Sequence, residues 1–149
     1  MGDAARRALI EELDRAFLEF ADFVREIPRE MYDAAVPGEE GSVRAILRHV
    51  VEAGYGHVTQ MAPAVDGVEA ARRFPSPVLL DDPESWVAAL MDVGRYAREV
   101  LANVDDAALE RRFKSRWGQD YDGEQMLEHA TCHPGRHARQ LRRFFDGEL

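Results

Sequence analysis

Apolar residues recur every three to four positions in four stretches of the chain, which is the spacing of a helix that buries one face. We expect helices over about 3–27, 42–61, 83–104 and 122–145. The apolar stripe of the first comprises Leu9, Ile10, Leu13, Phe17, Phe20, Val24 and Ile27. No segment alternates apolar and polar residues for long enough to indicate a strand. The pattern therefore predicts an all-α protein.

Residues just before three of these segments carry the signals of helix starts. Ser42 is a favourable N-cap for the second helix, and Asp82 followed by Pro83 marks the start of the third. Asp122 precedes the last helix, with Gln125 three residues later, which is the spacing of a capping box. These local signals fix where the helices begin.

Two of the connections between helices are long, at 62–81 and 105–121. Within the first, DGVEAARRF (66–74) is expected to form a short helical turn. Long connections argue against a simple up-down-up-down order, so we expect a four-helix bundle with two long connections. Gly54 and Gly56 are poor helix residues in the second helix, and they indicate a close approach of another backbone.

Composition narrows the class of protein. A length of 149 residues suits one domain spanning 1–149, and a net charge of −9 argues against a nucleic-acid-binding surface. No apolar run approaches the roughly 20 residues that span a bilayer. The acidic residues Glu11, Glu12 and Asp14 argue against a signal peptide, and Cys132 is the single cysteine, so no intrachain disulfide can form. These features predict a cytoplasmic protein.

Three histidines are spaced four residues apart in the stretch EHATCHPGRHARQL, at His129, His133 and His137. Side chains at i and i+4 of a helix share a face, so two imidazoles can bind one metal ion. On a helical wheel His137 lies within the apolar stripe and His133 at its edge, whereas His129 is about a quarter-turn or more away, at a solvated edge. A shared metal or separate buried hydrogen bonds would satisfy the two inner imidazoles equally well.

Pro134 and Gly135 stand between two of these histidines. Pro134 cannot donate to the carbonyl of Ala130 and its ring clashes with that carbonyl, so we expect the helix to bend or widen there. Such a bend changes the angle between the imidazoles of His133 and His137. An incidental kink that serves packing is an equally good explanation.

The second helix offers two candidates for a third metal ligand, since open metal sites typically use three protein ligands. Periodicity favours His57, which lies nearer the apolar stripe than His49. Glu52 follows His49 by three residues, from where a carboxylate can orient an imidazole or take a proton. A lone glutamate on a helix is more often simply solvated.

Two further groups of residues have candidate chemistry. A basic cluster in the second long connection can hold a substrate carboxylate, although a solvated loop is the commoner role; it comprises Arg111, Arg112, Lys114 and Arg116, followed by Trp117. Cys132 points about 100° away from His133 on the helix, so we interpret it as a packed thiol and not as a ligand.

The second helix begins with SVRAILRHVVEA, and the last helix contains HPGRHARQLRRFF. Together these two motifs resemble those of the DinB/YfiT-like metalloproteins. In that superfamily a second-helix histidine, in a pattern like L-x-H-hydrophobic-x-x-(D/E), joins two final-helix histidines spaced HxxxH, and a Gln-hydrophobic pair follows. LRHVVE matches at His49, and HPGRHARQL matches at His133 and His137 with Gln140 and Leu141 as the trailing pair. The resemblance covers essentially the whole chain.

The resemblance implies a four-helix bundle that binds a divalent ion, usually zinc or nickel, with His49 preferred over His57 as the third ligand. Some branches are similar to mycothiol or bacillithiol S-transferases and to the mycothiol-dependent maleylpyruvate isomerase. An ion held by three neutral imidazoles makes water acidic or binds a thiol as thiolate. We therefore predict a metal-dependent thiol transferase or hydrolase acting on a small molecule, with a low-molecular-weight thiol as one candidate partner.

The alternative is a non-catalytic metal-binding or structural bundle, with a stress-related role suggested by the family's name alone. A homodimer is expected from the resemblance and from no residue pattern. The chain departs from the family pattern at Pro134 and Gly135, because many members have a regular helical turn between the two ligands that correspond to His133 and His137. A bend that separated the imidazoles too far would remove the metal site.

Overall fold

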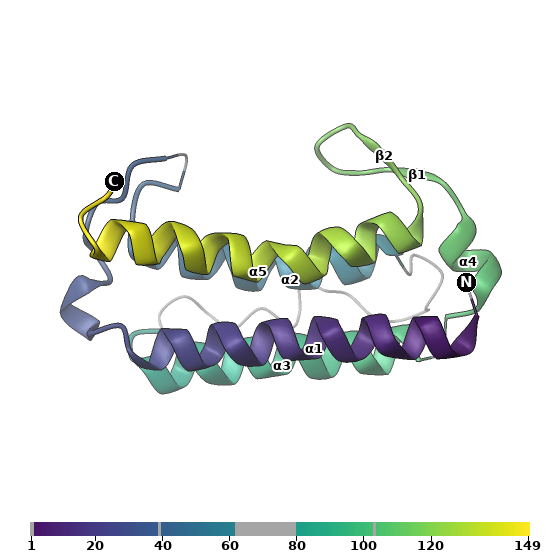
Figure 1. Cartoon of the computed structure of the whole chain (residues 1–149), viewed down its shortest axis with the longest axis horizontal. Helices are drawn as coiled ribbons and strands as arrows, with labels where there is room; N and C mark the ends of the chain where they lie inside the picture. The colour runs from purple at the N-terminus through teal and green to yellow at the C-terminus, as the bar shows by residue number, and fades with distance from the viewer. Residues whose placement is uncertain (1, 39, 62–79, 103) are drawn as a thin grey trace.

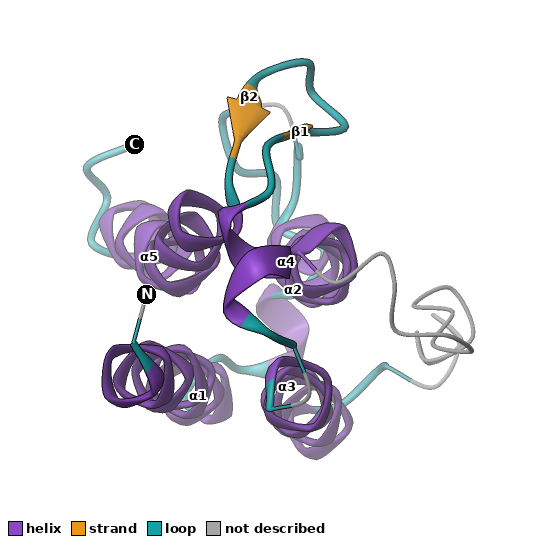
Figure 2. Cartoon of the chain, turned by 90° about the vertical axis from the view of Figure 1, so that its right-hand side faces the viewer, coloured by secondary structure: helices purple, strands orange, loops and turns teal. Residues whose placement is uncertain are grey.

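Four long helices form a two-layered bundle in the computed structural model, which describes residues 2–38, 40–61, 80–102 and 104–149. α2 and α5 make one layer and α1 and α3 make the other (Figure 1). Viewed end-on, α1 packs beside α3 and α5, and α2 packs beside the same two helices (Figure 2). Their bounds are α1 (Asp3–Arg25), α2 (Val43–Met61), α3 (Pro83–Leu101) and α5 (Gly123–Phe145). The predicted all-α four-helix bundle is confirmed.

The shorter elements lie in the connections. They are the 3₁₀ helix η1 (Arg29–Met31), the helix α4 (Asp106–Glu110), and the strands β1 (Phe113–Lys114) and β2 (Asp120–Tyr121). β1 and β2 pair antiparallel as a small hairpin that rises above α5 and α2 (Figure 1). The sequence did not predict this hairpin, because two-residue strands are too short for alternation to show. The helical turn expected at 66–74 lies outside the described residues.

The predicted helix starts are confirmed by their hydrogen bonds. Asp82 accepts from the backbone N–H of Ser85 at 2.9 Å, and Asp122 accepts from that of Gln125 at 2.9 Å. Both N-caps form complete capping boxes. Ser42 Oγ accepts from the N–H of the third residue after it at 3.2 Å. Side chains therefore satisfy backbone donors that the first helical turns leave unpaired.

The core is a continuous apolar cluster enclosed by the four helices. Its largest fully buried side chains include Trp86, Tyr32, Tyr96, Phe17, Phe20 and Leu13. In the described part of the chain, every helix is too short or too polar to cross a bilayer. The apolar faces that predicted the helices are thus buried where the helices pack against one another.

Gly54 is the point at which α2 approaches its neighbours most tightly. A Cβ atom added there would lie 2.6 Å from Val93 Cγ1 of α3 and 2.7 Å from Phe17 Cζ of α1. Both separations are far below ordinary carbon–carbon contact distances. The neighbours at this glycine are therefore side chains and not the backbone that the sequence indicated, and a side chain at position 54 would collide with them.

We expect Gly54→Ala to destabilise the protein by about 1–3 kcal/mol, because overpacking outweighs the roughly 1 kcal/mol that alanine gains over glycine in a helix. Urea unfolding measures the change. Gly135→Ala is the matched control, since its Cβ would meet only Arg139 Nη1 at 3.7 Å, and it should stabilise by about 0.5–1 kcal/mol. A Gly54→Ala protein as stable as the parent would contradict the tight packing.

Candidate metal centre

All five histidines of the chain meet between α2 and α5. Their ring centroids form a connected series in which neighbours lie 4.6 to 5.1 Å apart. The series begins at His137 and His49, passes through His133 and His57, and ends at His129. Such convergence follows from the helical spacing of the residues on each helix and from the packing of the two helices against one another.

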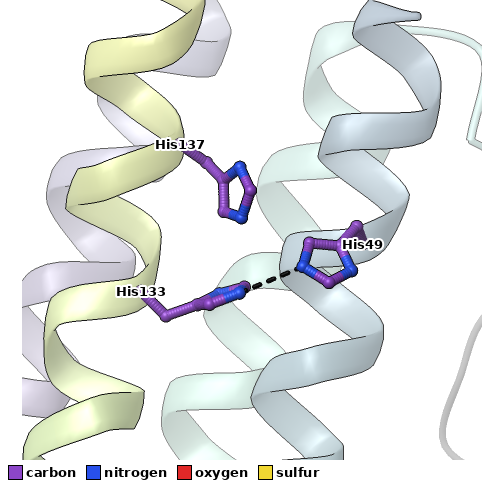
Figure 3. Close-up of side chains that lie close together, drawn as sticks. All are labelled: His49, His133 and His137. Atoms are coloured by element: carbon purple, nitrogen blue, oxygen red, sulfur yellow. Dashed lines mark hydrogen bonds between the residues drawn. The ribbon is translucent and has the colours of Figure 1, made fainter. Parts of the chain in front are cut away.

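His49, His133 and His137 form the tightest part of the series, and their imidazoles point toward one another (Figure 3). One ligand atom from each lies within 4.8 Å of the others. The Nε2 atoms of His49 and His133 are 3.0 Å apart. Two nitrogens bound at about 2.0–2.1 Å to one tetrahedral ion would lie about 3.3 Å apart. The structure therefore brings the three residues predicted as metal ligands together.

Gln140, three residues further along α5, fixes the tautomer of His137. Its Nδ1 donates to Gln140 Oε1 at 2.9 Å, and because an amide oxygen only accepts, the proton lies on Nδ1. The Nε2 atom then carries a free lone pair, and it is buried without a hydrogen-bond partner among the residues that the structure describes. A buried polar atom of this kind is normally satisfied, so a metal ion fits the site.

Burial keeps the imidazoles of His133 and His137 neutral. His133 and His137 are each only 5% exposed. Burial, together with the neighbouring imidazoles, lowers the pKa of His133 to about 2, and burial also lowers the pKa of His137. Because neutral imidazole is the form that binds metals, both side chains are ready to act as ligands at pH 7.

Pro134 does not separate the two α5 histidines. α5 continues as helix from Gly123 to Phe145, and the rings of His133 and His137 remain 4.6 Å apart. The helix therefore does not widen between them, and the expected bend stays a prediction. Pro134 lies on the side of α5 that borders α1, whereas the histidines lie on the side that faces α2.

His57 is buried as its periodicity predicted, yet it lies outside the three-histidine cluster. Its ring packs between His133, at 5.1 Å, and His129, at 4.9 Å, and its Nδ1 atom is buried without a partner. Burial lowers the pKa of His57 to about 3. His129 is half-buried against Trp117, with 5.3 Å between ring centroids, and it is less solvated than the sequence indicated.

Of the two glutamates near the cluster, the one nearer to a histidine nitrogen is not the one that the sequence indicated. Glu52 Oε1 accepts a hydrogen bond from Arg48 at 2.8 Å and has no hydrogen bond or ion pair with a histidine among the described residues. Glu40, which sequence reasoning missed, places Oε1 4.0 Å from His49 Nε2. A loop with left-handed turns at Gly38 (φ 133°) and Gly41 (φ 80°) brings Glu40 there.

A pocket of ≈420 Å³ opens beside the cluster. Its walls come from α2, α5 and the tip of the β1–β2 hairpin, which contributes Arg116 and Trp117. A cavity of ≈450 Å³ on the α1 side of α5 contains no histidine. Cys132 borders that cavity and is exposed, so the expected packed thiol is wrong; its helix face points away from the bundle interior.

We expect Gln140→Leu to weaken zinc binding about 10–100-fold, because His137 Nδ1 loses the acceptor that fixes its tautomer and ring orientation. Zinc competition against a chromophoric chelator measures this change. Gln140→Glu retains an acceptor at the same distance along the side chain and should bind zinc at least as tightly as the parent. Equal affinities for the leucine variant and the parent would show that this hydrogen bond does not orient a ligand.

Comparisons with known proteins agree with this geometry. The family model described as the DinB superfamily matches residues 10–141. The structure of YfiT from Bacillus subtilis, described as a probable metal-dependent hydrolase with an unusual four-helix bundle topology, superposes with a TM-score of 0.72 at 13% identity and covers 96% of this chain and 87% of that one. At this identity the likeness establishes the shared fold. A comparison with curated protein sequences gives no match. The family model spans most of the chain, and the chain therefore belongs to the DinB superfamily.

Proposed function

We propose that the chain is a metal-dependent hydrolase that binds a divalent ion, zinc or nickel, through His49, His133 and His137. The observation that carries this proposal is the convergence of three imidazoles, all ligand atoms within 4.8 Å, beside an open pocket that His49 and His133 line. Three nitrogen donors suit zinc and nickel, and fewer than four protein ligands leave a position for chemistry. YfiT, which shares the fold, is described as a probable metal-dependent hydrolase.

When bound, such an ion supplies Lewis acidity, which polarises a carbonyl group and yields a water nucleophile near pH 7. The chain's own residues prepare the site for it. Gln140 keeps the proton of His137 on Nδ1 and so leaves Nε2 free. The Glu40 carboxylate lies beside His49, where it adds negative charge at the edge of the cluster.

Thiol transfer would need a thiol from outside the chain. The single cysteine, Cys132, is exposed and borders the cavity on the α1 side of α5, not the pocket beside the histidines. Water needs no second substrate, so hydrolysis is the simpler reaction for this pocket. Transfer to a low-molecular-weight thiol is kept as a separate arm of the test.

The test uses the full chain stripped with chelator and then loaded with zinc or nickel. Chromogenic esters and amides are assayed with and without added thiols, and release of product should depend on the ion. Consumption of the thiol with substrate would replace hydrolysis by thiol transfer. Stoichiometric metal with no turnover in either arm would overturn the proposal in favour of a non-catalytic metal-binding bundle.

A further inference from the structure

Two arginines that line the histidine pocket have no ion pair within the described part of the chain. They are Arg116, from the hairpin tip, and Arg136, from α5. Neither is paired with a carboxylate among the described residues, whereas many arginines elsewhere are paired, such as Arg6 and Arg44. In a chain with 28 acidic and 19 basic residues, carboxylates are the abundant partner. Two unpaired guanidinium groups in one pocket therefore point to an anion that comes from outside the chain.

The fold fixes Arg116 at the pocket. The hairpin turns over Ser115–Gly118, with Gly118 at φ 87° and its N–H bonded to the Ser115 carbonyl at 2.9 Å. The backbone N–H of Arg116 donates to Gln60 Oε1 of α2 at 3.0 Å, which ties the turn to the bundle. Arg116 Nη1 lies 3.6 Å from the position of a Cβ at Gly56, so the guanidinium lies over α2.

Arg136 reaches the same space from the opposite wall. It lies on α5 between His133 and His137, and it lines the pocket together with His133. Both guanidinium groups thus border the same cavity.

Acidic and aromatic side chains also line the pocket. Glu40 and Glu52 line it together with His49, and Glu52 is already paired with Arg48. Trp117 is 44% exposed, and its ring is tilted by 31° to that of His129. An exposed indole beside guanidinium groups offers a flat apolar surface next to positive charge.

We propose that Arg116 and Arg136 bind the acidic group of a small organic anion whose apolar or planar body lies against Trp117. Planar guanidinium groups suit carboxylates and phosphates, which accept paired hydrogen bonds. The identification of this anion as the substrate rests on the proposed function, since its remaining part then extends toward the three-histidine cluster. Binding of the anion itself needs no metal.

The test titrates the metal-free full chain, in chelator at pH 7.5, with benzoate, phenyl phosphate and neutral benzamide, followed by ligand-observed NMR. Benzoate or phenyl phosphate should bind at least about tenfold more tightly than benzamide, and the tighter of the two identifies the acidic group. Arg116→Gln and Arg136→Gln should each weaken anion binding about tenfold. Arg139→Gln is the matched control: it lies three residues along α5, has no ion pair among the described residues and faces the α1 side, so it should leave binding unchanged.

Equal binding of benzamide and the anions, or anion binding that survives both pocket variants, would overturn the inference. Circular dichroism and thermal melting verify that the variants fold, as expected for exposed positions. Metal content is measured separately. A chain that binds zinc and no anion overturns this inference alone, whereas a chain that binds the anion and no zinc retains the anion site and overturns the proposed hydrolase.

Discussion

Replacing His133 with alanine is expected to weaken zinc binding on the order of a thousandfold, because the site loses one of three nitrogen ligands and the two that remain come from different helices. His133 occupies the centre of the cluster, with its Nε2 3.0 Å from that of His49 and its ring 4.6 Å from that of His137. Chelator competition gives the affinity, and elemental analysis of the purified chain gives the stoichiometry, which should be one ion per parent chain.

His129→Ala provides the matched control for this experiment. His129 lies on the same helix one turn before His133, with 5.9 Å between their ring centroids, and it is outside the three-histidine cluster. Its loss should leave zinc affinity within about threefold of the parent, a free-energy change well below that of a lost ligand. A His133→Ala chain that retains full metal content would show that other residues hold the ion.

The metal-free protein should lose about 4 kcal/mol of unfolding free energy between pH 7.5 and pH 5. Burial lowers the folded-state pKa of His57 to about 3 and that of His133 to about 2, whereas both titrate near 6.5 when unfolded. As the pH falls through 6.5 the unfolded chain binds protons that the folded chain does not. The contribution of the two neutral imidazoles to the unfolding free energy is therefore fully present above about pH 7. It decreases as the pH falls below 7, by about 2 kcal/mol for each imidazole at pH 5.

Urea unfolding in chelator across this pH range measures the loss. His57→Gln removes one titrating group while it keeps a polar side chain of similar length, so it should reduce the loss of unfolding free energy at pH 5 by about 2 kcal/mol. The lowered pKa values of His129 and His137 act in the same direction and steepen the parent's dependence. Stability that stayed constant from pH 7.5 to pH 5 would show that these imidazoles are hydrated in the folded protein.

The bundle could be predicted because its determinants are local. Apolar periodicity marked each long helix, and Asp82 and Asp122 marked two starts through side chains that cap the very next turn. The β1–β2 hairpin could not be predicted in the same way. Its strands are two residues long, and its position depends on the hydrogen bond from Arg116 to Gln60, 56 residues away in the sequence.

In the candidate site, too, the features set by local sequence could be predicted, and those set by distant contacts could not. His133 and His137 share a helix, so their spacing alone predicted that they face the same side. His49 was selected by the family motif, against a periodicity that favoured His57. Both imidazoles lie against α5, and only the motif indicated which of them joins His133 and His137. The position of Glu40 near His49 could not be predicted, because a loop and not a repeating pattern brings it there.

The placement of the two tryptophans gives the protein an intrinsic optical reporter. Trp86 is 2% exposed in the core, and Trp117 is 44% exposed at the mouth of the pocket. In a Trp86→Phe chain all remaining indole emission would come from the hairpin tip. Quenching and spectral shift of that single fluorophore would then follow occupancy of the pocket directly, in real time and without any attached label.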